Sequence, residues 1–347
     1  MIWSLAGKKR TRACMMALMS ILTANAAFGM EKFSPMLPGV TTGVPAGALP
    51  PDGWYFNLSV FPQNGSLKDG SGNNAFIPAP GVGQPKVSNL GVTPQVMWVP
   101  GVEFLGARYA AMITQPFNYL DTSFSGGNPS STNYAMFNTI LTPLMLSWKL
   151  GQGWFFGSGM SVYLKNGTFT STYNPYAFNG TGLGREQVAN NSYANNFWTF
   201  EPNFALSYLG NDWNITLNNT FNFNTKNFTT GYTSGSTYYL DTTVAKSFGP
   251  WQLGVIGNYT QQFENDTING VVVPATPNVN SRGSKIQHVK IGPLIAYTFE
   301  NHMTLSARYL QAVHTENDQS VSIFWLTLAT PLAALNPPAR ANGLITK

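Results

Sequence analysis

Five charged residues stand inside stretches of the 347-residue chain that otherwise alternate apolar and polar side chains. They are Arg108, Glu201, Asp241, Lys290 and Arg308. Each falls in phase with the polar set, so all five side chains would point to one wet face of a sheet and could share one depth. Cations facing carboxylates across a constriction would create a transverse field that selects solutes. The same groups could equally form a packed salt-bridge network that fills a narrow interior.

Residues for covalent or metal chemistry are scarce. The chain has no H-E-x-x-H, G-x-S-x-G or P-loop motif, and its single cysteine, Cys14, excludes a paired-cysteine metal site. The histidines are His288, His302 and His314. Only His314, followed by Glu316 and Asp318, resembles a catalytic cluster, and a solvated loop is the simpler interpretation. We therefore expect no catalytic residues, no metal and no cofactor.

The elements that would carry the five charged residues are long alternating strands. Residues 197–228 read FWTFEPNFALSYLGNDWNITLNNTFNFNTKNF, with bulky apolar residues at every second position and Asn, Thr or Ser between most of them. A period of two indicates a strand with a different environment on each face, and the Gly-Asn-Asp stretch is typical of a hairpin turn. The strands approach the roughly 9 to 11 residues that cross a bilayer at a tilt. The apolar face would then contact lipid, and the amide-rich face would line a lumen.

The same pattern predicts about twelve strands, at 53–61, 87–99, 102–115, 135–150, 153–165, 195–209, 212–224, 238–248, 251–263, 284–299, 302–314 and 320–329. Short turns alternate with long polar connectors at 62–86, 116–134, 166–194, 225–237 and 264–283. Tryptophans gather near the short-turn ends, as in an interfacial girdle: Trp54, Trp98, Trp148, Trp154, Trp213 and Trp251. A soluble sandwich would not favour one end of its strands. The fold class is therefore all-β, a transmembrane antiparallel up-and-down β-barrel over residues 53–330.

The ends of the chain indicate export. Residues 1–26 carry a cationic start, an apolar stretch and the Ala24-Asn25-Ala26 cleavage pattern of a secretory signal peptide. This segment holds four of the 19 basic residues, which nearly balance the 14 acidic ones once it is removed, so net charge indicates no nucleic-acid partner. We expect the outer membrane of a Gram-negative cell, with the lipid bilayer, the barrel-assembly machinery and a small solute as partners.

The segment LPGVTTGVPAGALPPDGWYFNLSVFPQNG at 37–65, with its entry Gly47 to Pro51 and its aromatic first strand, resembles the family of the MetA pathway of phenol degradation. That resemblance implies an outer-membrane transporter of aromatic or other hydrophobic compounds. Within the N-terminal segment 27–52, residues 33–52 are too rich in Pro and Gly for a strand or helix. They would form a periplasmic arm, which we favour, or a plug that narrows the lumen, and residues 331–347 would form a tail.

The function that the sequence favours is an outer-membrane channel for diffusion or uptake of small, aromatic or hydrophobic solutes. The five charged residues are its candidate lumen-lining, substrate-binding groups. A structural or adhesive barrel that binds partners through its extracellular loops is the alternative, and a barrel-embedded surface hydrolase is less favoured because it needs a catalytic group at the rim.

Overall fold

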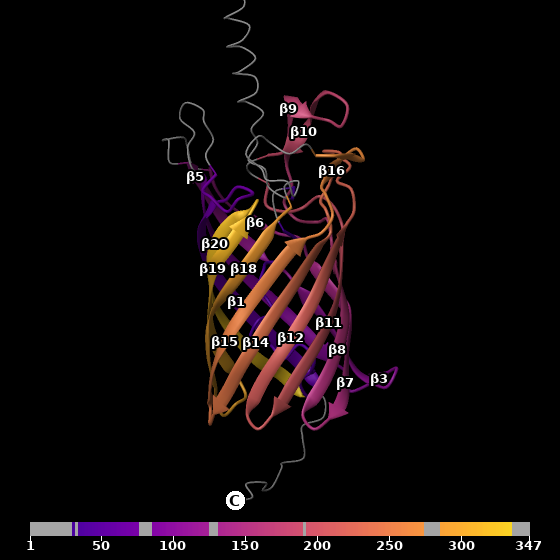
Figure 1. Cartoon of the computed structure of the whole chain (residues 1–347). Coiled ribbons are helices and arrows are strands. Elements are labelled where there is room, and N and C mark those ends of the chain that lie inside the picture. Colours follow the sequence, from indigo (N-terminus) through magenta and orange to yellow (C-terminus); the bar gives the residue numbers. More distant parts are fainter. Residues whose placement is uncertain are drawn as a thin grey trace, which may run out of the picture.

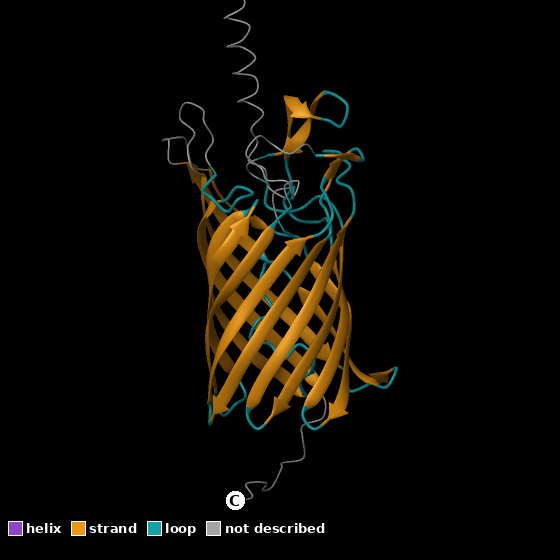
Figure 2. Cartoon of the chain, viewed as in Figure 1, coloured by secondary structure: helices purple, strands orange, loops and turns teal. Residues whose placement is uncertain are grey.

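The computed structural model describes residues 30–31, 34–75, 85–124, 131–189, 192–273 and 285–334. Twelve antiparallel strands form a closed barrel with strongly tilted strands (Figures 1 and 2). The ring closes where the first strand pairs with the last, from Gly53 opposite Ala334 to Leu67 opposite Gln319. Closure removes the unpaired edge that lipid cannot solvate. The predicted fold class is confirmed.

The barrel strands follow one another around the ring in chain order. They are β1 (Gly53–Leu67), β2 (Pro85–Val99), β4 (Ala107–Thr114), β7 (Ile140–Gly151), β8 (Trp154–Tyr163), β11 (Thr199–Gly210), β12 (Trp213–Asn224), β14 (Thr237–Phe248), β15 (Trp251–Gln262), β18 (Gln287–Thr298), β19 (Thr304–Glu316) and β20 (Gln319–Ala334). Every neighbouring pair is antiparallel. No helix in the described part of the chain is long and apolar enough to span a membrane.

The connector predicted at 116–134 is largely sheet. β4 resumes after a break as β5 (Phe117–Phe124), which pairs with the upper part of β2 and with β6 (Ser131–Met136). Pro116 lies at the break, where a residue without an N–H group cannot donate to the ladder. Asn138 secures the corner on the neighbouring strand, since its amide donates to the carbonyls of Leu164 and Asn195. The third and fourth predicted strands are therefore longer than expected and interrupted.

The remaining connectors also contain short strands. β3 (Glu103–Phe104) lies in a connector at the short-turn end. At the opposite end, β9 (Ser171–Phe178) and β10 (Leu183–Val188) form a hairpin, and β13 (Tyr232–Thr233), β16 (Thr267–Ile268) and β17 (Val271–Val272) form a small sheet (Figure 1). These elements rise above the barrel, as expected for surface loops.

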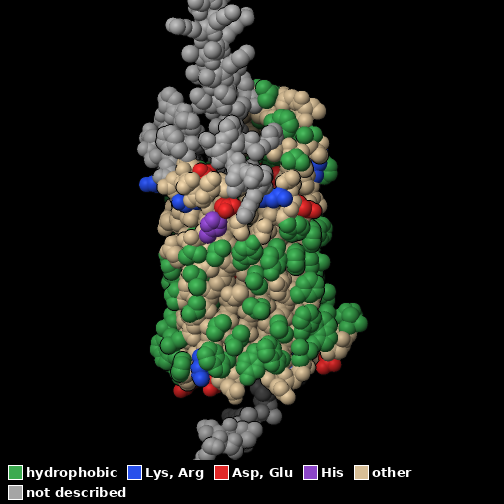
Figure 3. Space-filling model, in the orientation of Figure 1, with side chains coloured by type: hydrophobic (Ala, Val, Ile, Leu, Met, Phe, Trp, Pro, Cys, Tyr) green, Lys and Arg blue, Asp and Glu red, His purple; other side chains and the backbone are tan. Residues whose placement is uncertain are grey.

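The alternation that predicted the strands matches their two faces. On β12, Ile215 and Leu217 are 38% and 45% exposed, whereas Asn214 and Asn218 are 4% and 3% exposed because they point inward. The space-filling view shows a broad hydrophobic belt across the visible face of the barrel, with charged side chains above and below it (Figure 3). Such a belt is what lipid requires of an outer wall.

The predicted tryptophan girdle is present on the outer face. Trp54, Trp98, Trp154, Trp213 and Trp251 are between 37% and 47% exposed. Several contact other aromatic rings, such as the stacked pair Trp54 and Trp98, whose centroids are 5.7 Å apart. Amphipathic rings at this level fix the barrel at a membrane interface.

Residues 34–52 fold into the lumen, and the favoured periplasmic arm was wrong. The segment begins among the long loops, where Glu31 contacts Ser234, and ends at the short-turn end, where β1 starts. It has no ladder of its own, so its backbone groups need partners. The inward hydroxyl and amide side chains of the wall supply them.

The boundaries at the two ends of the chain also differ from expectation. β20 continues to Ala334, so residues 331–334 belong to the barrel rather than to a tail. The last pairs, Gly53 with Ala334 and Trp54 with Ala333, account for this extension. The predicted signal peptide at 1–26 and the rest of the tail, at 335–347, lie outside the described residues.

Candidate functional site: the barrel lumen

A cavity of about 1090 Å³ occupies the lumen beside the inward-folded segment 34–52. Its lining reaches from His288 and Asp318, near the long loops, to Asn211 and Gly249 in the short turns. It therefore extends along most of the height of the wall. The inward side chains and the segment therefore do not fill the interior of this twelve-stranded barrel completely.

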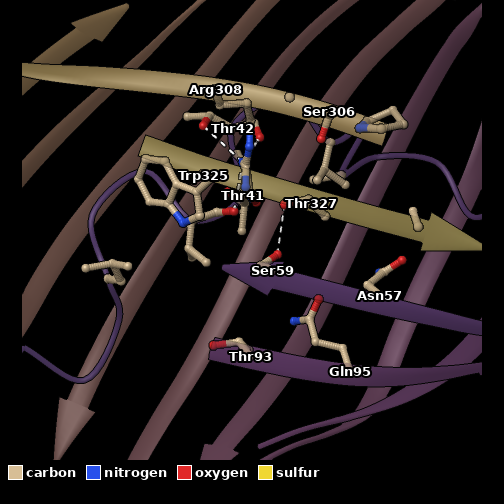
Figure 4. A pocket seen from close by; sticks show the side chains of 18 of the residues that line it. Thr41, Thr42, Asn57, Ser59, Thr93, Gln95, Ser306, Arg308, Trp325 and Thr327 are labelled. Atoms are coloured by element: carbon tan, nitrogen blue, oxygen red, sulfur yellow. Dashed lines mark hydrogen bonds between the residues drawn. The ribbon is translucent and has the colours of Figure 1, made fainter. Parts of the chain in front are cut away.

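One side of the cavity is formed by small uncharged polar groups from β1, β2, β19 and β20 (Figure 4). They include Asn57, Ser59, Thr93, Gln95, Ser306 and Thr327. Several bond to one another: the hydroxyls of Ser59 and Thr327 are 2.8 Å apart, and Gln95 donates to Thr114 at 3.0 Å. Because these groups bond to one another, they form fewer hydrogen bonds to water, and this side of the cavity is only moderately polar.

A second side of the cavity is apolar. Phe61, Val321 and Trp325 line it and belong to a hydrophobic cluster that also includes Leu310 and Leu37. The rings of Phe61 and Trp325 have centroids 6.4 Å apart. Apolar side chains pointing into a lumen favour solutes with a hydrophobic surface, because they bind water poorly.

The segment 34–52 is held by hydrogen bonds along its length. The Thr41 amide and hydroxyl both donate to Asp241, the amide at 2.9 Å and the hydroxyl at 2.6 Å. The Gly43 amide donates to Thr243 at 2.7 Å, and the Gly47 amide donates to Ser207 at 2.9 Å. Segment and wall thus form one structure, and the segment narrows the lumen.

Two of the predicted cations bind backbone carbonyls of this segment. Arg108 donates to Leu49 at 3.0 Å and to Pro50 at 2.6 Å, and it forms an ion pair with Asp52 at 2.8 Å. Arg308 donates to the carbonyls of Val40 and Thr42. A guanidinium has several donors in a fixed fork, which suits it to holding successive carbonyls.

The other three predicted residues form no ion pair with these cations, although Asp241 attracts Arg308 across residues 40–42. Glu201 is buried and accepts from Asn222 at 2.6 Å. Asp241 also accepts from Asn258, and Lys290 donates to the carbonyl of Val321 at 3.0 Å. None of the five forms an ion pair with another of the five, so the packed salt-bridge network is not present. A role for the five in solute selection stays a prediction.

The five residues do not share one depth, and that expectation was wrong. Arg108 lies beside residues 49–52 at the short-turn end, whereas Lys290 binds Val321, close to the turn between β19 and β20. The strands of a barrel tilt, so residues in hydrogen-bond register climb as they pass around it. Asp241 is in register with Asn258, and Asn258 with Lys290, along such a rising line.

The upper end of the segment lies in a polar cap made by the long loops. Glu31 accepts from Asn227 at 2.8 Å and from Thr230, and its amide donates to Ser234. Burial raises the pKa of Glu31 to about 7, and burial likewise raises the pKa of Asp266 to about 7. No group of three or more potential metal ligands occurs among the described residues.

Sequence reasoning missed Phe61 and Trp325. Both occupy positions in phase with the polar set, where an ordinary pore would carry a polar residue. The signal was available in the run Ile323 to Leu326, which is apolar without interruption and so cannot have one polar face.

The model of the family described as "Putative MetA-pathway of phenol degradation" matches residues 66–328. The chain belongs to this family. No protein with a curated description matches the sequence. Among solved structures, the COG4313 outer membrane channel from Pseudomonas putida F1 is 15% identical, with 85% of this chain and 99% of that chain covered and a TM-score of 0.60. The Ralstonia pickettii toluene transporter TbuX is 12% identical over 87% of this chain and 99% of that chain, with a TM-score of 0.42.

Membership in the family agrees with the resemblance noted in residues 37–65, although the matched region begins at the end of that segment. The similarity to the Pseudomonas channel concerns the fold. Together these findings make the protein a transmembrane β-barrel of this family.

Proposed function

We propose that the barrel carries small hydrophobic solutes, aromatic ones above all, passively across the outer membrane. The observation that supports this most directly is the lumen cavity of about 1090 Å³, which extends along the wall and is apolar on the side of Phe61 and Trp325. An ordinary water-filled pore has a polar interior. The family description, which refers to phenol degradation, and the COG4313 channel fold support the same proposal.

Uptake by cells tests the proposal. Cells that produce the protein and matched cells with an empty vector are given radiolabelled benzyl alcohol or a radiolabelled sugar alcohol of similar mass. We expect the initial uptake of benzyl alcohol to rise several-fold with the protein, and that of the sugar alcohol to change little. An equal rise for both would indicate an unselective pore, and no rise for either would refute the proposal.

Export is part of the proposal. The cationic start, apolar stretch and Ala24-Asn25-Ala26 site support removal of residues 1–26 and delivery to the barrel-assembly machinery. Amino-terminal sequencing of protein purified from outer membranes should then begin near Ala27. Recovery of a membrane-inserted chain that starts at Met1 would contradict the cleavage.

A further inference from the structure

Two buried cations on the lumen side form no ion pair at contact distance within the described residues. Lys290 on β18 is 1% exposed and Arg308 on β19 is 5% exposed. Asp241 attracts both cations while it accepts from Thr41 and Asn258, and Asp318 attracts Lys290 while it pairs with His288. A buried charge is normally paired in direct contact, so cations beside a cavity that lack such a contact favour the binding of an anion there.

Two N–H donors at the same place also lack an acceptor. Arg308 Nε and Trp325 Nε1 are buried and meet no acceptor in the part of the chain that the structure describes. The residues are direct cross-strand neighbours on β19 and β20, and the guanidinium carbon lies 5.0 Å from the centroid of the Trp325 ring. Both side chains line the lumen cavity (Figure 4). Buried donors nearly always find an acceptor, so these two point to an oxygen supplied from the cavity.

The donors border the apolar side of the cavity. Phe61 and Trp325 present aromatic rings, and Leu37 packs beside them from the inward segment. A flat apolar ring could therefore lie against this surface while an oxygen on that ring reaches the donors. Hydrocarbons without an oxygen would leave both donors unpaired and bind less tightly.

We propose that Phe61, Trp325 and Arg308 form a binding site for a small aromatic carboxylate inside the lumen. The carboxylate accepts from Arg308 and Trp325 while the ring packs against Phe61 and the Trp325 indole. Lys290 is in register with Ala312, four residues from Arg308, or about 13 Å along the strand. It attracts the anion toward the site from the long-loop side. This assignment rests on the proposed function and names its substrate class.

Binding to purified mature protein in detergent tests the site. Radiolabelled benzoate is the probe, and benzyl alcohol and benzylamine are competitors of nearly equal shape. We expect unlabelled benzoate to displace the probe at concentrations at least about tenfold lower than either competitor, since a charged hydrogen bond exceeds a neutral one. Equal displacement by all three would overturn the site.

Variants locate the site within the lumen. Trp325→Phe keeps a ring but removes the indole donor, and Lys290→Met keeps the length of the side chain but removes its charge. Each should weaken benzoate binding by several-fold to about tenfold and weaken benzyl alcohol binding less, because a neutral hydroxyl loses a weaker interaction. Lys246→Met is the control, because Lys246 lies on the outer face over the Trp213 ring. Full benzoate affinity in both lumen variants would overturn the site.

Uptake by cells separates this inference from the proposed function. If benzyl alcohol enters through the barrel but benzoate shows neither preferential binding nor preferential uptake, the site is refuted and the channel stands. Benzoate binding without uptake of any aromatic refutes the channel and leaves the site. If a variant fails to show the heat-dependent gel mobility of a folded barrel, the competition series on the unaltered protein still decides.

Discussion

A charged residue that points into a lumen can bind backbone groups of the protein itself instead of the solute. Asp241 and Arg308 were expected to face each other across open water, yet Asp241 binds the amide of Thr41 and Arg308 binds the carbonyl of Thr42. Phase in a strand identifies the face to which a side chain points. It does not identify the partner, because residues 34–52 have no period from which to predict their path.

Glu31 makes the anchoring of the segment dependent on pH. Burial raises its pKa from 4.5 to about 7, so the folded cap binds the proton more tightly than the released segment does. The stabilisation is fully present below about pH 4.5 and is lost as pH rises through about 7, a difference of about 3 kcal/mol. Hydrogen exchange of the peptide that contains Glu31, corrected for the intrinsic rate at each pH, should show this decrease in protection.

Glu31→Gln provides the control for the pH effect. The amide cannot titrate, so protection should vary less with pH than in the unaltered chain. Protection should still decrease somewhat as pH rises, because the pKa of Asp266 is raised to about 7 in the same cap. A slope as steep as that of the unaltered protein would show that Glu31 is not responsible.

At the scale of elements, the inward segment packs closely against the barrel wall where it has a glycine. Gly39 has a φ of +90°, and a Cβ atom there would lie 2.2 Å from Cδ1 of Leu310. Only a residue without a side chain fits this backbone and this contact. Residues 34–52 form neither strand nor helix, as their Pro and Gly content predicted, but composition alone does not reveal which surface such a segment covers.

We expect Gly39→Val to displace the segment from the lumen while the barrel stays closed. The left-handed backbone would cost about 1 to 2 kcal/mol for a residue with a side chain, and the overlap with Leu310 adds to that cost. Single-channel conductance in planar bilayers should increase. Gly182→Val is the matched control, because a Cβ at Gly182 meets nothing within 4 Å. Unchanged conductance in Gly39→Val would mean that the segment does not restrict the path.

At the scale of the whole molecule, the sequence was most informative where two environments alternate. Strand number, closure and the outward tryptophans all follow from the period of two and from the alternation of short and long connectors. The interruption at Pro116 and the small sheets in the loops were missed, because strands of two to eight residues lack enough repeats to establish a period.

The orientation of the barrel can be tested with single cysteines. Phe228, in the loop after β12, is 81% exposed, and Gln152 is exposed in the turn between β7 and β8. On intact cells an impermeant thiol reagent should label Phe228→Cys and leave Gln152→Cys unlabelled, because short turns face the periplasm. Both should react after the outer membrane is opened. The reverse labelling pattern would mean that the short turns, and not the long loops, face the outside of the cell.

A charged side chain on the lipid-facing surface should destabilise the barrel. Leu217, in the middle of β12, is 45% exposed on the outer face. Arginine there should reduce the free energy of unfolding from lipid vesicles by about 2 to 4 kcal/mol, measured by urea titration. Glu300→Arg, in an exposed short turn, should change it little. Equal stability of the two variants would place Leu217 outside the hydrocarbon layer.

The path of residues 34–52 has a consequence for surface display. The first barrel strand begins at the short-turn end, whereas Glu31, earlier in the chain, is held among the long loops at the opposite end. A peptide joined ahead of Met30 would therefore leave the barrel among the surface loops without an insertion into any of them. Antibody binding to such a fusion on living cells would show that the segment displays a fused peptide at the cell surface.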